Sequence, residues 1–230
     1  MLIAVKAETT SRLSEVFQLI DVIKRLEAIP PLPDPNEVKI LRGLFWVHLY
    51  AALEYAVSNG VQRFLQAIDT LNAPPVHFTP RFFSVVLDSN FSALRNVGED
   101  KSWTKRVELL NAQVSGVPTK INPDIFGLYL QNVWVEKMEI LFSCLEINQP
   151  IVPDPSYKPY IDELVSQRNG VAHGRMSALA VGSSRRSNEL LIRFNAISAI
   201  CTHFFDCLEQ HHSTRSVIQY LHRATYPVTS

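Results

Sequence analysis

The distribution of the 14 prolines constrains the fold of this 230-residue chain more than any other feature of its sequence. They cluster at 30–35, 74–80, 118–123 and 150–159, with one more at position 227. Helix interiors exclude proline because it lacks a backbone N–H and clashes with the preceding turn, whereas loops tolerate it. Strand-like alternation is scarce between the clusters. We therefore expect an all-α helical bundle with proline-rich connections.

The longest proline-free span predicts a central helix. Thr10 to Ala28 forms a first helix in this prediction, and an extended PPLPDP link follows it. Asn36 is then expected to cap a long helix that ends near Leu71. Its middle, Leu44 to Val57, is apolar nearly all the way round. A helix of this kind is buried by neighbours on several sides, so we expect it at the centre of the bundle.

Further helices complete one domain over residues 1–230 in this prediction. They are expected as one or two helices within 81–117, then one each within 122–146, 160–175, 188–211 and 217–223. Phe91 is among the apolar anchors expected in the first of these spans. Gly174 is expected to end the helix over 160–175, because glycine tolerates the left-handed backbone conformation, and a loop should follow it.

Composition favours a soluble, cytoplasmic protein. Lys plus Arg and Asp plus Glu balance at 22 each, so polyanion binding would need a local patch. The N-terminal residues lack the features of a signal peptide, and no apolar run reaches the length of a membrane span. Cys144, Cys201 and Cys207 are odd in number and follow no paired spacing, which suits a reducing compartment.

The stretch Tyr160 to Arg175 carries the most unusual charge in the chain. On a helix it forms an apolar stripe from Ile161, Leu164, Val165 and Ala172. Arg168 falls near the centre of this stripe, where an unpaired guanidinium is costly to bury. Asn169 and His173 are four residues apart on the flank beside it. This edge is a candidate site, although a buried arginine is often half of a structural ion pair.

Glu54 is a second charge in apolar surroundings, in the middle of the expected central helix. A carboxylate there needs a cation or hydrogen-bond donors. Arg168 and His173 are candidate partners, and Arg42 and Arg63 remain alternatives.

Basic residues are concentrated after the candidate site. From Arg168 to Arg193 the chain has five arginines and one acid, Glu189. Arg175, Arg185 and Arg186 are therefore candidates for binding an RNA backbone. The alternative is an ordinary solvated loop.

A metal site is a weaker hypothesis. His203, Cys207 and His211 recur at four-residue spacing, which suits zinc or copper geometrically. The spacing matches no strong zinc signature, and the neighbouring phenylalanines indicate core packing. We expect neither a metal nor another cofactor.

The run LVSQRNGVAHG resembles the signature of the HEPN (higher eukaryotes and prokaryotes nucleotide-binding) superfamily. That signature is an Arg followed by a polar residue and, four to six residues after the Arg, a His; here these are Arg168, Asn169 and His173. The run LYAALEYAV, which contains Glu54, resembles the early helix of larger free-standing bacterial HEPN proteins. The likeness covers the chain from about residue 37, with Met1 to Ile29 as an additional helix.

The resemblance implies an α-helical bundle that dimerises around one cleft and cleaves RNA without metal. It gives catalytic roles to Arg168 and His173, with Asn169 and Glu54 in support. It also implies a toxin–antitoxin or phage-defence system, with a cognate antitoxin or regulator as partner. Some HEPN toxins carry a modifiable Tyr two residues after the His; Arg175 stands there, which puts this form of silencing in doubt.

The chemistry of the two residues agrees with RNA cleavage. Histidine titrates near neutrality and can move protons, and arginine can bind two phosphate oxygens. Attack by the RNA's own 2′-hydroxyl yields a 2′,3′-cyclic phosphate. Two alternatives remain open: a non-catalytic HEPN-like module that binds RNA, nucleotide or protein, and a structural protein in which Arg168 only pairs with Glu54.

Overall fold

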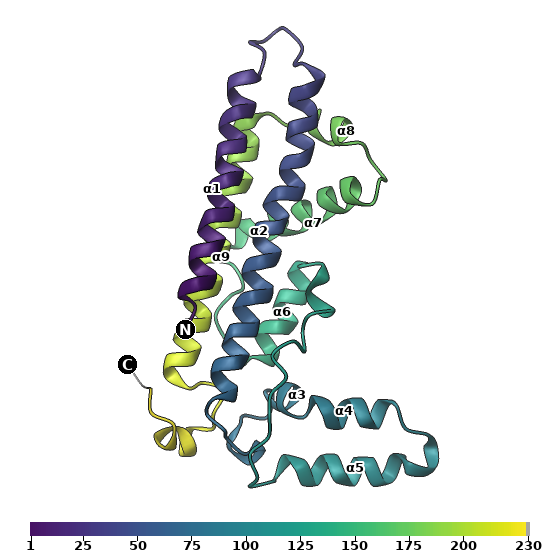
Figure 1. Cartoon of the computed structure of the whole chain (residues 1–230), viewed down its shortest axis with the longest axis vertical. Helices are drawn as coiled ribbons and strands as arrows, with labels where there is room; N and C mark the ends of the chain where they lie inside the picture. Colours follow the sequence, from purple (N-terminus) through teal and green to yellow (C-terminus); the bar gives the residue numbers. More distant parts are fainter. Residues whose placement is uncertain (229–230) are drawn as a thin grey trace.

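Three long helices form the column around which the chain is built. The computed structural model describes residues 1–228, and α1 (Ile3–Leu26), α2 (Asn36–Asp69) and α9 (Ser187–Thr214) run along its length (Figure 1). Residues 1–228 contain no β-strand, only an isolated bridge between Phe78 and Ile218. The all-α prediction is confirmed.

α2 is the central helix, as its composition predicts. It packs against α1, α7, α8 and α9. Its buried side chains lie on nearly every side and include Phe45, Trp46, Leu49, Leu53 and Val57. The predicted cap is wrong, because α2 begins at Asn36 itself and Pro35 precedes it without a side-chain cap.

α1 begins earlier than predicted, at Ile3 rather than near Thr10. Val5 and Thr9 are buried, so the packing that stabilises the helix extends toward the N-terminus.

The helices that carry the candidate site lie on one side of the column. α7 (Lys158–Ala172) and α8 (Ala178–Gly182) both pack against α2 (Figure 1). The loop expected after Gly174 therefore contains a short helix. Two glycines permit its close approach: a Cβ on Gly43 would lie 2.0 Å from the Ala178 carbonyl oxygen, and one on Gly182 would lie 1.8 Å from that of Lys39.

The segment before α7 contains the helix expected within 122–146, in the second half of that span. Within 122–146 only α6 (Val135–Cys144) is an α-helix, preceded by turns and by η2 (Tyr129–Gln131). η3 (Pro155–Tyr157) then leads directly into α7. Ala172, expected on the apolar stripe, is exposed because α7 ends there, whereas Ile161, Leu164 and Val165 are buried as predicted.

The other end of the column carries an arm of two helices. η1 (Pro75–His77) and α3 (Phe83–Val86) lead into α4 (Asp88–Arg95) and α5 (Glu99–Gln113), which project together from the column (Figure 1). Neither α4 nor α5 contains a buried residue, and Phe91, an expected anchor, is 43% exposed.

The C-terminal part also departs from the prediction. The last described helix is η4 (Tyr220–Thr225), a 3₁₀ helix in place of the α-helix expected over 217–223. α9 is the one helix of residues 1–228 that is long and apolar enough to cross a membrane. It packs against α1, α2 and α7, and this packing accounts for its apolar composition.

Candidate functional site

An open pocket of about 400 Å³ lies where α2, α7 and the segment after η2 meet. Its walls are formed by Val47, Tyr50, Ala51, Glu54, Gln131, Asn132, Arg168 and His173. Glu54 on α2 therefore lies in one site with Arg168 and His173 of the α7 region, although it is far from them in the sequence. Asn169 lies beside them and accepts a hydrogen bond from Arg168.

Arg168 is held by hydrogen bonds at both terminal nitrogens of its guanidinium, and its side chain is only 13% exposed. Nη1 donates to Asn169 Oδ1 at 2.9 Å, and Nη2 donates to the Gln131 carbonyl at 3.1 Å. The guanidinium carbon lies 3.7 Å from the centre of the Tyr50 ring. Glu54 Oε1 is 3.9 Å from Nη2, so the predicted ion pair is present but long. These contacts offset the cost of placing a cation on an apolar face.

Tyr50 links α2 to the segment after η2. Its hydroxyl lies 3.0 Å from the Gln131 carbonyl and 3.3 Å from Glu54 Oε1, and it accepts a hydrogen bond from the Val133 N–H at 3.1 Å. Burial, together with the charge of Glu54, raises the pKa of Tyr50 to about 12. Tyr50 is therefore a neutral donor at physiological pH and holds the backbone that also binds Arg168.

Glu54 occupies a site that disfavours its charge. Desolvation raises the pKa of this carboxyl above its ordinary value, although Arg168 and the Tyr50 hydroxyl oppose the shift. The carboxyl therefore lies in the pocket beside the cation, with a pKa set by these opposing effects.

His173 lies at the end of α7, where the helix stops. Its backbone N–H donates to the Asn169 carbonyl at 3.1 Å, and the following Gly174 has a φ of +67°. This left-handed conformation favours glycine, as predicted for the helix end. The His173 side chain is exposed and lines the pocket. An imidazole in this position can exchange protons with both solvent and a ligand.

None of the three candidate RNA-binding arginines lines the pocket. Arg175 is exposed close to His173 in the chain. Arg185 binds Glu163, with Nη2 2.6 Å from Oε1, and Arg193 binds the same carboxylate at 3.0 Å. Glu163, which lies outside the stretch from Arg168 to Arg193, thus partly neutralises the local excess of positive charge.

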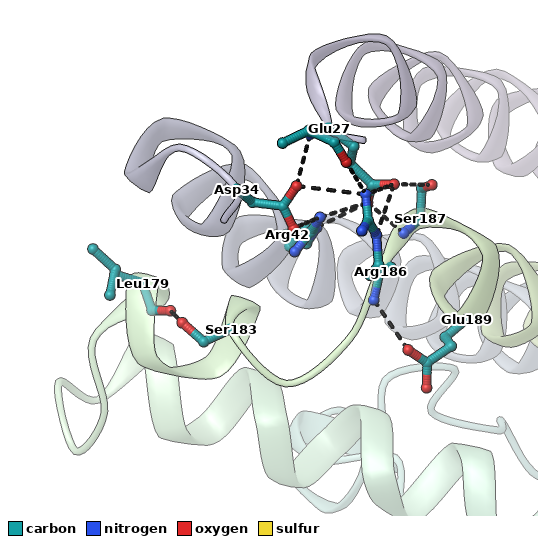
Figure 2. A network of polar contacts seen from close by, with 9 residues as sticks. Glu27, Asp34, Arg42, Leu179, Ser183, Arg186, Ser187 and Glu189 are labelled. Atoms are coloured by element: carbon teal, nitrogen blue, oxygen red, sulfur yellow. Dashed lines mark hydrogen bonds and ion pairs between the residues drawn. The ribbon is translucent and has the colours of Figure 1, made fainter. Parts of the chain in front are cut away.

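Arg186 belongs to a buried ionic network at one end of the bundle (Figure 2). Its Nη2 lies 3.4 Å from Glu27 and 3.5 Å from Asp34, and both carboxylates also bind Arg42. The Ser187 N–H and hydroxyl donate to Glu27 as well. This network joins α1, α2 and the start of α9. The Arg186 guanidinium therefore pairs with carboxylates of the protein itself, in place of the RNA contact predicted for it.

The histidines and cysteine considered for metal binding make other contacts. His203 Nε2 lies 2.7 Å from the Pro150 carbonyl, and His211 Nε2 lies 2.5 Å from the Glu146 carbonyl. Nε2 must carry the proton to donate to a carbonyl, so it is not available as a ligand in this arrangement. Residues 1–228 contain no cluster of three side chains placed to hold a metal ion.

Gln131 and Asn132 are pocket residues that the sequence patterns do not reveal. Gln131 ends η2 and Asn132 follows it, and hydrogen bonds from Tyr50 and Arg168 to the Gln131 carbonyl hold this part of the chain in place. Tyr50 could have been found, because it lies one helical turn before Glu54 on the same side of α2.

Comparison with known proteins gives one match. A family model described as RiboL-PSP-HEPN matches residues 7–210. Neither the search of curated proteins nor the search of solved structures returned a match.

Proposed function

Because the chain belongs to the RiboL-PSP-HEPN family, whose HEPN domain indicates an RNA-related function, we propose that it is a metal-independent endoribonuclease. The observation that carries the proposal is the shared pocket of Arg168 and His173. A fixed cation beside an exposed imidazole matches the requirements of RNA cleavage by the substrate's own hydroxyl.

In the proposed reaction, His173 accepts the proton of the 2′-hydroxyl as its oxygen attacks the adjacent phosphorus. Arg168 binds the non-bridging oxygens and stabilises the negative charge that develops on them. The bond to the 5′-oxygen breaks, and that oxygen takes a proton. The products are a 2′,3′-cyclic phosphate and a 5′-hydroxyl. Asn169 and Glu54 support the reaction by holding the guanidinium.

The second proton-transfer group comes, in this proposal, from a second copy of the chain. An apolar stripe on α2, formed by Ile40, Leu44, Val47 and Ala51, runs into the pocket. Ile40 is 39% exposed and Leu44 is 44% exposed. Exposed apolar residues at this helical spacing suit a two-fold interface, which would place two His173 side chains at one cleft.

The proposed cellular setting rests on the resemblance to larger free-standing bacterial HEPN proteins. We place the protein in a toxin–antitoxin or phage-defence system, with a cognate antitoxin or regulator. We also place it in the cytoplasm, where its three free cysteines would stay reduced. Induced expression should inhibit growth, and His173→Ala should relieve the inhibition.

One observation favours a second candidate, a non-catalytic module that binds RNA, nucleotide or protein. Both Nη atoms of Arg168 already donate to acceptors within the chain. Each nitrogen keeps one further N–H for a phosphate, so this does not exclude catalysis. A protein that binds RNA tightly without forming a cyclic phosphate would fit the second candidate.

The test is cleavage of single-stranded RNA by purified protein in EDTA. We expect the parent to cut, and both His173→Ala and Arg168→Met to lose at least about a hundredfold in rate while remaining folded. His222→Ala is the matched control, because His222 stacks on His77 outside the pocket. Equal cutting by His173→Ala would remove the proposed mechanism.

A further inference from the structure

Asn132 occupies a fixed place in the wall of the pocket. The Gln131 carbonyl before it binds Arg168 and Tyr50, and the Val133 N–H after it donates to the Tyr50 hydroxyl. The Asn132 carbonyl also accepts a hydrogen bond from the Trp134 N–H at 3.0 Å. The backbone on both sides of Asn132 is therefore tied to the residue that supports the guanidinium.

The side chain of Asn132, in contrast, is not satisfied. Its Oδ1 is buried and has no hydrogen-bond partner among residues 1–228. Arg168 Nε, in the wall of the same pocket, is also buried and lacks a partner within that range. Buried polar atoms in folded proteins are nearly always paired, so an unpaired acceptor and an unpaired donor in one pocket need an explanation. A ligand that carries both kinds of group provides one.

Rotation can make this amide available. Asn132 as a whole is half-buried and lines the pocket, and its terminal torsion has a broad range, so rotation of the amide is a way to meet a ligand. The amide then presents an acceptor and a donor side by side. Adenine is the base that an asparagine amide matches best, because its N6 amino group donates to Oδ1 while N7 accepts from Nδ2. Single-stranded RNA leaves these base atoms open.

We propose that Asn132 binds an unpaired adenine next to the phosphate held by Arg168, and so sets the sequence preference of the site. The proposal rests on the proposed function for its RNA substrate. It assigns Asn132 a binding role and leaves proton transfer to His173.

The experiment uses four oligonucleotides that differ only in the base beside a single cleavable ribonucleotide, with a second set that varies the base on the other side. For the parent we expect kcat/KM to be about tenfold or more higher with adenine at one of these two positions. Asn132→Ala should reduce this preference to within about twofold, because it should lower kcat/KM for the adenine substrate more than for the other three. Asn111→Ala, an exposed asparagine on α5, is the control and should keep the preference.

A purely structural role predicts a different pattern, because loss of fold or of Arg168 positioning would lower kcat/KM for all bases equally. That result, or a parent without adenine preference, would overturn the proposal. Asn132→Ser is measured alongside, so that an unfolded alanine variant does not decide the outcome.

Binding separates this inference from the proposed function. The affinity of the same sequences, with 2′-deoxy at the cleavable position, is measured for His173→Ala and for His173→Ala with Asn132→Ala. If the parent does not cut RNA but adenine preference in binding depends on Asn132, the nuclease proposal fails and this inference stands. If the parent cuts RNA and Asn132→Ala does not change its base preference, the nuclease proposal stands and this inference fails.

Discussion

The guanidinium carbon of Arg168 lies 3.7 Å from the centre of the Tyr50 ring, and both side chains bind the carbonyl of Gln131. A cation at this distance from an aromatic ring is attracted by the charge distribution of its face. The Tyr50 hydroxyl adds a bridge to the segment after η2. The position of Arg168 therefore depends on a residue of α2 as much as on its own helix.

This relationship makes Tyr50→Phe informative, since the ring remains while the hydroxyl is lost. The buried Val133 N–H then loses its acceptor, which should lower the free energy of unfolding by about 1–3 kcal/mol. We expect RNA cleavage to fall about tenfold as the segment after η2 loosens, a change of about 1.4 kcal/mol in the barrier. Urea unfolding and cleavage rates measure the two effects. Tyr220→Phe, at an 83% exposed position, should change neither stability nor cleavage rate. If Tyr50→Phe also leaves both unchanged, the proposed role of the Tyr50 hydroxyl is contradicted.

Glu54 predicts a specific dependence of stability on pH. Desolvation raises its pKa above the ordinary 4.5, so the folded protein holds this proton more tightly than the unfolded chain. The free energy of unfolding contributed by Glu54 should therefore fall as pH rises from about 4.5 through the raised pKa. Glu54→Gln removes this contribution, so parent and variant should diverge in that window. Urea unfolding at a series of pH values measures it, and parallel curves would contradict the assignment.

The buried network predicts the opposite dependence on pH. Burial alone would raise the pKa of Glu27, but hydrogen bonds from Ser187 and the charge of Arg42 hold it below 4.5, and Arg42 likewise lowers the pKa of Asp34. Their stabilisation is present above the ordinary carboxyl range and is lost as pH falls through the lowered values.

Arg42→Met tests this network, because Arg42 is 2% exposed and its loss leaves two carboxylates without their main cation. We expect the free energy of unfolding at pH 7 to fall by about 3–5 kcal/mol, and the further loss in acid to be smaller than in the parent. Arg106→Met, on the projecting α5, is the control. A loss at pH 7 no larger than that of the control would contradict the role of the network.

The contact of α8 with α2 predicts the effect of a single methyl group. A Cβ on Gly43 would lie 2.0 Å from the Ala178 carbonyl oxygen, so Gly43→Ala must push α8 away. Overpacking of this kind costs about 1–3 kcal/mol. Gly98→Ala places its Cβ in open space and should be nearly neutral. Thermal unfolding compares the two variants, and equal stability would show that α8 is not held this closely.

Local periodicity was sufficient to predict the parts of the site that lie on regular helices. The helical periodicity of α7 predicted Arg168 near the centre of an apolar stripe and His173 on the flank of the helix. The apolar surroundings of Glu54 indicated that its carboxylate needed a partner. The positions of Gln131 and Asn132 could not be predicted, because tertiary hydrogen bonds from α2 and α7 fix the backbone at the end of η2.

The free positive charge of the stretch from Arg168 to Arg193 could not be predicted for the same reason, because contacts between distant segments determine it. Arg185 and Arg186 pair with Glu163, Glu27 and Asp34, which lie outside the stretch from Arg168 to Arg193, and Arg185 also pairs with Glu189 within it. The exposure of α4 and α5 could not be predicted either, because it depends on how the helices pack. Their apolar spacing is helical, but no other element of residues 1–228 covers them sufficiently to bury a residue.

The central claim is that His173 and Arg168 direct the RNA's own 2′-hydroxyl onto its phosphate. Mass spectrometry of the 5′ fragment, after cleavage in EDTA, tests this most directly. The account predicts a fragment that ends in a 2′,3′-cyclic phosphate with the parent and no such fragment with His173→Ala. A fragment ending in a 3′-hydroxyl, or the same cyclic end with His173→Ala, would contradict it.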